Sequence, residues 1–420
     1  MKNIKIKFLG GTKQIGKSAI LVDNGKKKIL LDYGTYPGKE PEFPPMVNPK
    51  DIDAIVLSHA HLDHSGAIPM LYRNVVSPPL ITTFPTLELA DLLIRDMIKL
   101  AKGKVPFSID SLQRMRRAFV PAEYGEPIEL DRSTSITLYN AGHIPGSASI
   151  LIEMDGTRIW YTGDINTIKT RLLEPATLVD DVDILIIEST YATRRHPDRS
   201  EEEKRFLKRI HEILDNNGTV LVPAFSVGRS QEVMCILEHH MFRKPTALDG
   251  MAQAATGIIM GFPEYIRNYK ILRRSIKRVK WMATKSQRKK MLRKPGLVIS
   301  PAGMLNGGWS IWYLKQVYKN NKDGIFFVSY QVPGTLGHKI VNSKSFTIGN
   351  KETKVEAHVD YFELSSHTDN QGLHKIVGKA GASKVFVVHG DEDSTEQFVK
   401  ELVDKGIDTY APRMEEEFVI

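Results

Sequence analysis

The sequence predicts a mixed α/β fold in which one catalytic domain is interrupted by a second, inserted domain. Apolar runs of strand length, such as VDILIIEST and GTVLVPAFS, occur among longer helical stretches, a pattern typical of α/β proteins. Candidate metal ligands stop at Asp164 and return only near His367 and His389, which indicates an insertion between them. A chain of 420 residues is long enough for roughly two to three domains.

The N-terminal part is predicted to consist of short strands joined by tight turns. IKIKFLG is followed by SAILVDNGKKKILLDYG with a turn at Asn24-Gly25, and DAIVLS leads directly into the stretch SHAHLDHSGAIP. SITLYNAG comes later as a further strand. ASILIEMDGTRIWYTGD is predicted to form a hairpin around Asp155-Gly156.

Helices are predicted between and after these strands. PTLELADLLIRDMIKLAK has the length and pattern of a helix, and SEEEKRFLKRIHEIL opens with Ser200 as its expected N-cap and with acidic residues in its first turn. GLVIS and GIFFVSY add strands of the buried type. The tail is predicted to close with the strand KVFVVHGD, the helix STEQFVKELVDKG and a short final strand.

The composition favours an intracellular protein without membrane spans. Hydrophobic residues make up 41% and charged residues 25%, which excludes a disordered or collagen-like chain. Cys235 is the one cysteine, so a disulfide within the chain is impossible and any metal must have nitrogen and oxygen ligands. Neither a signal peptide nor a long apolar run is present. We therefore expect a cytoplasmic location and no membrane partner.

The basic excess of the chain lies in one segment. Residues 265–322 contain 16 Lys or Arg and no Asp or Glu, so the remaining chain has 42 basic against 49 acidic residues, a balance of −7. Trp281, Trp309 and Trp312 lie among these cations, and cations mixed with aromatic rings suit phosphate contact and base stacking on single strands. The alternative is an ordinary solvated helix face. The absence of acids over so long a run favours binding of a polyanion.

The stretch SHAHLDHSGAIP offers four candidate metal ligands. His59 and His61 are two residues apart after an apolar strand, so both can point toward one metal, while Asp63 and His64 turn toward a second. A catalytic tetrahedral site keeps one position open for water, so these ligands with further ones indicate two metals more readily than one. The alternative, in which the histidines only cap or pack, is disfavoured by the density of the pattern.

Three further candidates follow predicted strands. His143 lies in NAGHIPGSAS, where glycines let the backbone come close to a metal, while Asp164 ends RIWYTGD and His389 ends KVFVVHGD. Each residue alone would more often be structural or solvated. Together with the histidine loop they predict a metal centre.

The ordered motifs resemble those of a known family. LLDYG with Asp32, the histidine loop, GHIPGSA and YTGD are similar to the motif series of the metallo-β-lactamase fold. The later motifs ESTYATRRHPDR, PAFSVGRSQEVM, SPAGML, SYQVPGTLGHKI, FELSSHTD and VVHGD resemble the β-CASP nucleases, which include RNase J and the endonuclease of the cleavage and polyadenylation specificity factor with its archaeal relatives. The chain begins at the first predicted strand, so we expect the short form without KH domains.

The resemblance implies a two-zinc site. It assigns His59, His61 and His143 to one zinc and Asp63, His64 and His389 to the other, with Asp164 bridging both. Asp63, Asp32, Glu188 and His367 receive catalytic roles: Asp32 orients a ligand histidine, and Glu188 polarises His367 as the general acid toward the leaving group.

The resemblance also implies the architecture. It predicts a metallo-β-lactamase αββα sandwich interrupted by an α/β β-CASP cap, with RNA in the cleft between them. The boundaries are expected to give residues 1–192 and 363–420 to the sandwich and residues 193–362 to the cap. A hydroxide activated by two metals would hydrolyse RNA and leave a 5′ phosphate and a 3′ hydroxyl.

Several alternatives stay open at this point. We expect an endonuclease of RNA 3′-end processing or decay, and a 5′ to 3′ exoribonuclease of the RNase J type is the runner-up. A small-molecule hydrolase or di-iron oxidoreductase would lack the β-CASP motifs, and a catalytically weak RNA-binding subunit would be expected to have lost ligands. DNA is a narrower alternative, which His389 disfavours by family comparison.

The remaining expectations concern contacts with partners. Arg229 begins a predicted helix in VGRSQEV, so Arg229 and the neighbouring amides are candidates to hold a phosphate, and Ser365 is a second substrate-binding candidate through its hydroxyl. A structural role for Arg229 is nearly as well supported. Single-stranded RNA is the expected partner, and a homodimer and RNA-processing protein partners are further expectations.

Overall fold

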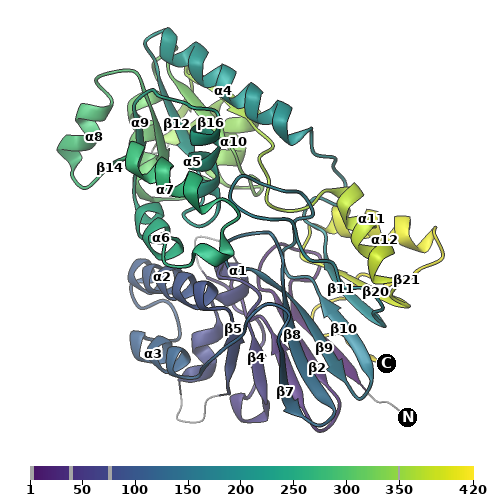
Figure 1. Ribbon diagram of the computed structural model, residues 1–420. Coiled ribbons are helices and arrows are strands. Elements are labelled where there is room, and N and C mark those ends of the chain that lie inside the picture. Colours follow the sequence, from purple (N-terminus) through teal and green to yellow (C-terminus); the bar gives the residue numbers. More distant parts are fainter. Residues whose placement is uncertain (1–3, 37–40, 74–77, 349–350) are drawn as a thin grey trace. The chain divides into compact units, whose positions relative to one another are not determined.

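The computed structural model describes residues 4–36, 41–73, 78–348 and 351–420, which form two compact units (Figure 1). Unit 1 consists of Met1–Lys169, Pro175–Arg195 and His367–Ile420, and unit 2 of Thr170–Glu174 and His196–Ser366. Apart from the short segment Thr170–Glu174, the chain therefore passes from unit 1 to unit 2 after Arg195 and returns to unit 1 after Ser366. The domain boundaries inferred from the sequence, after residues 192 and 362, stay a prediction.

Unit 1 is built on two seven-stranded sheets. The first has the order β22-β1-β2-β3-β4-β5-β6, antiparallel from β22 to β3 and parallel from β3 to β6. Asn24 and Gly25 form the turn between β2 and β3, as predicted. The strands are β1 Lys5–Gly10, β2 Ala19–Asp23, β3 Lys28–Leu31, β4 Ala54–Val56, β5 Leu80–Thr82, β6 Phe119–Pro121 and β22 Glu417–Val419.

The second sheet has the order β21-β20-β11-β10-β9-β8-β7. Strands β7 to β10 are antiparallel, and β10, β11, β20 and β21 are parallel. Asp155 and Gly156 both have positive φ between β9 and β10, which is the conformation of a tight hairpin turn. The strands are β7 Pro127–Asp131, β8 Thr134–Asn140, β9 Ala148–Met154, β10 Thr157–Tyr161, β11 Ile184–Glu188, β20 Lys384–Val388 and β21 Asp408–Tyr410.

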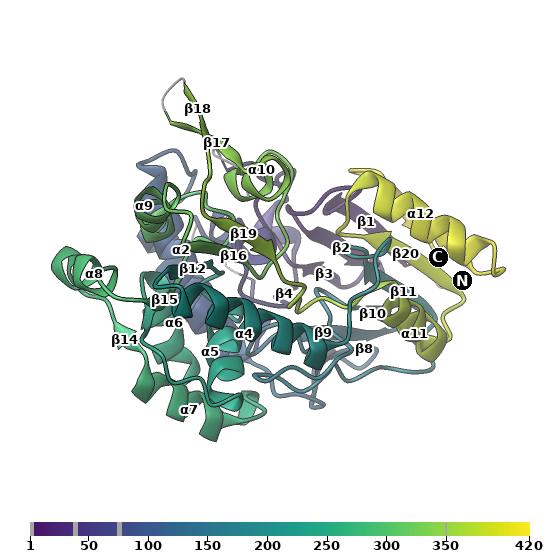
Figure 2. The same ribbon diagram turned by 90° about the horizontal axis from the view of Figure 1, so that it is seen from above.

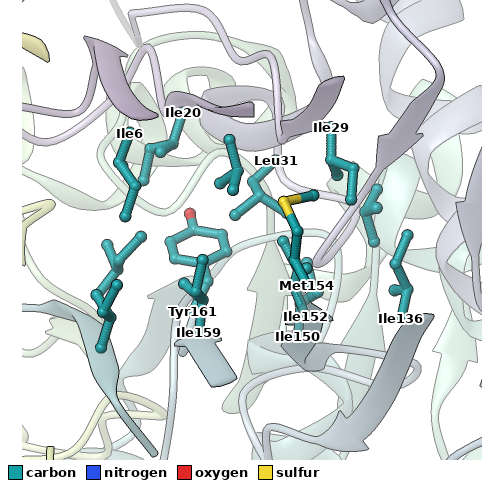
Figure 3. Packing of buried hydrophobic residues seen from close by; sticks show 14 of the residues in the cluster. Ile6, Ile20, Ile29, Leu31, Ile136, Ile150, Ile152, Met154, Ile159 and Tyr161 are labelled. Atoms are coloured by element: carbon teal, nitrogen blue, oxygen red, sulfur yellow. The ribbon is translucent and has the colours of Figure 1, made fainter. Parts of the chain in front are cut away.

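The core of unit 1 lies between the two sheets. Ile6, Ile20 and Leu31 of the first sheet face Ile152 and Ile159 of the second, and all are nearly excluded from solvent (Figure 3). Side chains alternate between the two faces of a strand, so one face of each sheet supplies this core. The outer face of the second sheet packs against two helices, α11 Asn370–Ala380 and α12 Glu392–Val403.

Unit 2 contains a six-stranded parallel sheet with the order β14-β13-β15-β12-β16-β19 (Figure 2). Its central strands are buried along their whole length, which explains their continuous apolar runs. The predicted mixed α/β fold is confirmed. The strands are β12 Thr219–Pro223, β13 Thr246–Leu248, β14 Lys280–Trp281, β15 Gly296–Ser300, β16 Gly324–Phe327 and β19 His358–Tyr361, and a hairpin is formed by β17 Ser345–Ile348 and β18 Lys351–Lys354.

Helices connect the parallel strands of unit 2. Helix α4 corrects one expectation, because Asp198 and not Ser200 caps it: the Asp198 carboxylate accepts the backbone N–H groups of Ser200 and Glu201. A carboxylate also complements the positive end of the helix, so the helix begins two residues earlier than predicted. The helices are α4 Arg199–Asp215, α5 Arg229–His239, α6 Met251–Ile259, α7 Tyr269–Arg278, α8 Lys285–Met291, α9 Gly308–Val317 and α10 Leu336–Ser343.

Unit 1 also contains the longest helix of the described residues, α2 Phe84–Ala101, followed by α3 Ile109–Arg117. Thr83 caps α2 by accepting the backbone N–H of Thr86, and a buried apolar face that includes Leu89, Leu93 and Ile94 holds the helix on the unit. Within the part of the chain that the structure describes, no helix combines the length and the apolar character needed to cross a lipid bilayer.

Candidate metal centre

The histidine loop leaves the first sheet where β4 ends. His59 and His61 precede the short helix α1 Leu62–Ser65, so Asp63 and His64 lie within its first turn. The backbone N–H of Ser18 donates to the Asp63 carbonyl at 2.9 Å. A Cβ atom on Gly34 would lie 1.7 Å from that same carbonyl oxygen, so only glycine lets the neighbouring chain support the loop this closely. The loop is therefore fixed from two sides.

The other candidate ligands meet at one edge of the second sheet. Strands β8 and β10 are both antiparallel to β9, and β10 is parallel to β11 and β20, so four strands end at the same edge. His143 follows β8, Asp164 follows β10, Glu188 is the last residue of β11, and His389 follows β20 directly. The topology thus brings together residues that lie up to 246 positions apart in the sequence.

Asp164 stands between two sets of histidines. Its Oδ2 lies 3.4 Å from His59 Nε2 and 3.5 Å from His143 Nε2. Its Oδ1 lies 3.3 Å from His64 Nε2 and 3.1 Å from His389 Nδ1. The two oxygens of one carboxylate therefore face different histidine sets.

The structure brings the candidate ligands into overlapping groups. One group combines His59, His61, His143 and Asp164, and another combines His64, Asp164 and His389. A third group combines Asp63 with His59 and His64, and Asp63 Oδ2 also lies 3.5 Å from His389 Nε2. Each group places its ligand atoms within 4.8 Å of one another, as a bound metal ion requires.

The ring nitrogens of the candidate ligands are arranged as they would be around bound cations. His143 Nε2 lies 3.1 Å from His61 Nδ1, and His64 Nε2 lies 3.3 Å from His389 Nε2, so lone-pair nitrogens converge on common points. Among the described residues, the buried His59 Nε2 has no partner at hydrogen-bond geometry, although it lies at ion-pair distance from Asp164. Converging nitrogens and an orphaned buried donor atom are what a metal ion would satisfy.

The pKa shifts divide these histidines: at His64 burial is outweighed by the carboxylates of Asp164 and Asp32, which raise the pKa well above its ordinary value, whereas the pKa of three other rings is lowered. Burial is the main cause that lowers the pKa of His59 and of His143, and burial together with His59 lowers the pKa of His61 to about 3. These rings are neutral at neutral pH, which is the form that binds metals. Burial opposes ionisation of Asp164, but the surrounding histidines, His389 first, outweigh it and hold its pKa well below the usual range.

Asp32 supports the site through His64. Its Oδ2 accepts hydrogen bonds from His64 Nδ1 at 2.7 Å, from Ser58 Oγ at 2.7 Å and from the Tyr161 hydroxyl at 2.9 Å, while its Oδ1 accepts the Ser58 backbone N–H at 2.7 Å. Because Nδ1 of His64 is occupied in this way, Nε2 of the ring is the atom that faces Asp164.

Glu188 and His367 form a pair beside the ligands. Nδ1 of His367 lies 3.0 and 3.1 Å from the two Glu188 oxygens, and Glu188 also accepts the backbone N–H of Ile165 at 2.8 Å. Nε2 of His367 lies 4.0 Å from Asp164 Oδ2, so the edge of the ring opposite to Glu188 faces the metal centre. Burial by itself lowers the pKa of His367, but Glu188 and Asp164 outweigh it and raise the pKa to about 9.

Arg229 and Ser365 lie in unit 2 and are not members of this cluster. Arg229 is buried, and its guanidinium donates to the carbonyl of Leu364 and, at 2.9 Å, to the hydroxyl of Ser366. The carbonyl of Ser365 accepts a hydrogen bond from Arg199 at 3.1 Å. Arg229 thus holds the loop that precedes His367, which is a structural role. Contact of Arg229 or Ser365 with the substrate stays a prediction.

Sequence reasoning missed the donors that hold Asp32. Tyr161 and Ser58 are common buried residue types, and neither belongs to a ligand pattern. One signal was available: Tyr161 lies three residues before Asp164 at the end of a strand, and a buried phenol requires a hydrogen-bond partner. The identity of that partner requires the fold, because Asp32 lies 129 residues away.

Three family models match successive parts of the chain. The model described as Beta-lactamase superfamily domain matches residues 20–219, Beta-Casp domain matches residues 230–340, and Zn-dependent metallo-hydrolase RNA specificity domain matches residues 352–412. A crystal structure of a protein of unknown function from Enterococcus faecalis V583 covers the whole of both chains with a TM-score of 0.63 at 15% identity, which shows a shared fold.

Several archaeal proteins are similar over most of the chain. RNase aCSPSF2 of Saccharolobus solfataricus is 35% identical over 397 residues, which cover 93% of this chain and 80% of the relative. Probable RNase MJ4 of Methanocaldococcus jannaschii is 35% identical over 429 residues, which cover 99% and 100%. Transcription termination factor FttA of the same organism is 34% identical over 450 residues, which cover 97% and 70%.

Proposed function

Because this chain belongs to the β-CASP family of metallo-β-lactamase-fold ribonucleases, we propose that it is a zinc-dependent hydrolase that cuts phosphodiester bonds of single-stranded RNA. The family and the fold class predicted from the sequence are confirmed. The observation that carries the proposal is Asp164, whose two carboxylate oxygens face two different histidine sets. A carboxylate in this position is suited to bridge two metal ions.

We assign the ligands of two zinc ions to these sets. His59, His61 and His143 would hold one ion, Asp63, His64 and His389 the other, and Asp164 both. When bound, the two ions would activate a water for attack on phosphorus and neutralise charge on the phosphate. Asp32 acts on this site as a positioning residue, because it fixes the tautomer and the ring orientation of His64.

His367 is proposed as the general acid of the reaction. Its raised pKa keeps a proton on the ring at neutral pH, and Glu188 holds Nδ1 so that Nε2 faces the metal centre. Donation from Nε2 to the departing 3′ oxygen would leave a 3′ hydroxyl on one product and a 5′ phosphate on the other. Glu188 positions the ring and stabilises its charged form.

The proposed biological role is internal cleavage in RNA 3′-end processing or decay. Relatives whose names include RNase and transcription termination factor support a role at RNA 3′ ends. The buried free cysteine Cys235 supports the cytoplasm as the location. A homodimer and RNA-processing protein partners remain part of the proposal.

Digestion of one RNA labelled separately at its 5′ and 3′ ends tests the reaction. An endonuclease produces discrete shortened fragments that extend from either labelled end to an internal cut, whereas a 5′ exonuclease releases labelled mononucleotides from the 5′ label alone. We expect discrete fragments and about two zinc ions per chain by elemental analysis. RNA left intact by the zinc-loaded chain would overturn the proposed function.

Two variants with matched controls test the assigned roles. Asp63→Ala should lose one zinc and most cleavage, while Asp404→Ala, an exposed carboxylate in unit 1, should keep both. His367→Ala should keep zinc and lose most cleavage. Its control is His374→Ala, because His374 also pairs with a glutamate, Glu401, at 2.9 Å. Equal activity of the two histidine variants would remove His367 as the acid.

A further inference from the structure

Unit 2 contains an open cavity of about 400 Å³ that the metal centre does not use. It lies where helices α5 and α7 end and where strands β13 and β14 begin. Parallel strands begin at one edge of their sheet, so the cavity lies at the edge opposite to Pro223, Leu248 and Ser300, where the strands end. Its volume is within the range of about 300–1,000 Å³ that is typical of ligand sites.

The cavity is far from the other end of α5. Arg229 begins this helix and Leu237 lines the cavity eight residues later, so about 12 Å of helix separates them at 1.5 Å per residue. A ligand in the cavity therefore occupies a place of its own in unit 2.

Cations surround this cavity. Arg243, Lys244, Lys277, Arg278 and Lys280 line it, and their one acidic companion in the lining is Glu238. The lining carries a net charge of +4, because five cations and one carboxylate contribute. Within the described residues, no ion pair involves Lys277 or Lys280, and both are exposed. These two ammonium groups are available to an anion.

Glu238 holds Arg243 and Arg278 of the cavity and the neighbouring Arg274. Its carboxylate is buried, and its oxygens lie 2.8 Å from Arg278 Nε, 3.3 Å from Arg274 Nε and 3.4 Å from Arg243 Nη1. The arginine side chains are about half exposed, so their remaining N–H groups reach solvent. A guanidinium held by one carboxylate is pre-organised to bind phosphate oxygens with its free donors.

The floor of the cavity is apolar. Met234, Leu237, Phe242 and Val279 line it and are largely excluded from solvent, and the exposed Pro245 lies beside them. An apolar floor below a rim of cations offers separate surfaces for the two parts of a nucleotide, the base and the phosphate. An anion without an apolar part would use only the rim.

We propose that this cavity binds a nucleotide of single-stranded RNA at a site separate from the metal centre. The inference rests on the proposed function, because RNA is the polyanion on which the chain is proposed to act. Acidic peptide is the competing polyanion, but glutamate and aspartate side chains have no flat apolar part for the floor. The site would let the enzyme hold a second part of the strand that it cleaves.

The test compares two double variants with the same change in charge. Lys277→Gln with Lys280→Gln removes the two available cavity lysines, whereas Lys289→Gln with Lys290→Gln removes two exposed lysines of α8 outside the cavity. Both pairs lie in the same basic segment of the full chain. Binding is measured by fluorescence anisotropy with a labelled single-stranded RNA, in a His367→Ala background that prevents cleavage.

The cavity pair should weaken RNA binding far more than the control pair. Each phosphate contact contributes about 0.7 to the salt slope on single strands, so losing two contacts lowers the slope by about 1.4 and weakens binding up to about 25-fold at about 0.1 M salt. Equal losses of RNA affinity in the two double variants would show that the lysines act only through their summed positive charge, and would overturn the cavity site. RNA should also protect Lys277 and Lys280 from acetylation in the unaltered chain, and protection limited to Lys289 and Lys290 would overturn it as well.

Two further arms distinguish the source of the ligand. Adenosine monophosphate carries the same nucleotide chemistry, and an acidic peptide carries only negative charge. If the cavity pair loses binding of either probe while RNA binding stays unchanged, the proposal is wrong. Cleavage of RNA by the wild-type chain, measured in the same series, tests the proposed function separately from the cavity site. If the chain cleaves RNA without using the cavity, the proposed function stands and the cavity site is wrong.

Discussion

The hydroxyl of Tyr161 offers a sharp test of how the chain holds its candidate metal ligands. It donates to Asp32 Oδ2 at 2.9 Å, and the same oxygen accepts hydrogen bonds from Ser58 and His64 at 2.7 Å. Tyr161→Phe removes this donor and leaves the ring in the core. A hydrogen bond to a charged group contributes about 1.5–3 kcal/mol, and because two side-chain donors remain, we expect a loss near the lower limit.

This loss should be measurable as metal affinity. About 1.4 kcal/mol corresponds to a factor of ten in an equilibrium constant. Zinc binding at the ligand set that contains His64 should therefore weaken about tenfold, while the set that contains His61 keeps its affinity. Burial and Asp32 hold the pKa of Tyr161 well above its ordinary value, so the phenol stays protonated and the loss should not change between about pH 6 and about pH 9.

Tyr72→Phe is the matched control. Tyr72 is equally buried, but its hydroxyl donates at 2.8 Å to the neutral carbonyl of Pro78. We expect it to lower the free energy of unfolding by about 1 kcal/mol and to leave zinc affinity unchanged. Competition with a chromogenic chelator and thermal unfolding with and without zinc measure both effects. Unchanged zinc binding in Tyr161→Phe, or equal weakening in Tyr72→Phe, would refute the reasoning.

Two other predictions follow from the same region. Glu188 raises the pKa of His367, and the general acid acts in its protonated form. Glu188→Gln should therefore shift the alkaline limb of the pH profile of kcat to lower pH, and an unshifted limb would contradict the pairing of Glu188 with His367. Gly34→Ala should lower the free energy of unfolding by about 1–3 kcal/mol or more, because the added Cβ would overlap the Asp63 carbonyl. Gly378→Ala, on an open face of α11, should leave the free energy of unfolding unchanged or raise it, and thermal unfolding measures both variants.

The relative positions of the candidate ligands in the histidine loop follow from local sequence more directly than the positions of the residues that support them. His59, His61, Asp63 and His64 are separated by a few residues, so strand alternation and one turn of helix already determine which of them share a direction. Of the donors around Asp32, Tyr161 comes from a strand 129 residues away and Ser58 lies 26 residues away, and no local rule connects them to Asp32. Contacts of that kind are set by the packing of two sheets.

The basic segment shows a different limit. The sequence predicts a cationic surface, because residues 265–322 contain no acidic residue. It does not predict a cavity, because Glu238, Arg243 and all apolar floor residues except Val279 lie outside that segment and are brought to it by α5 and its connection to β13. Counting charged residues predicts the net charge of a surface. Predicting a binding site also requires knowing which helices and strands bring their side chains together.

Strand order explains why Asp164 faces both histidine sets. In the second sheet β10 lies between β9 and β11, with β8 on one side of this group and β20 on the other. His143 comes from the β8 side and His389 from the β20 side, so a side chain that leaves the end of β10 has ligands on both sides. Asp63, by contrast, comes from the first sheet and joins the His389 set. The division of the Asp164 oxygens is therefore a consequence of topology, and replacing Asp164 should weaken both metal sites, whereas replacing Asp63 should weaken one.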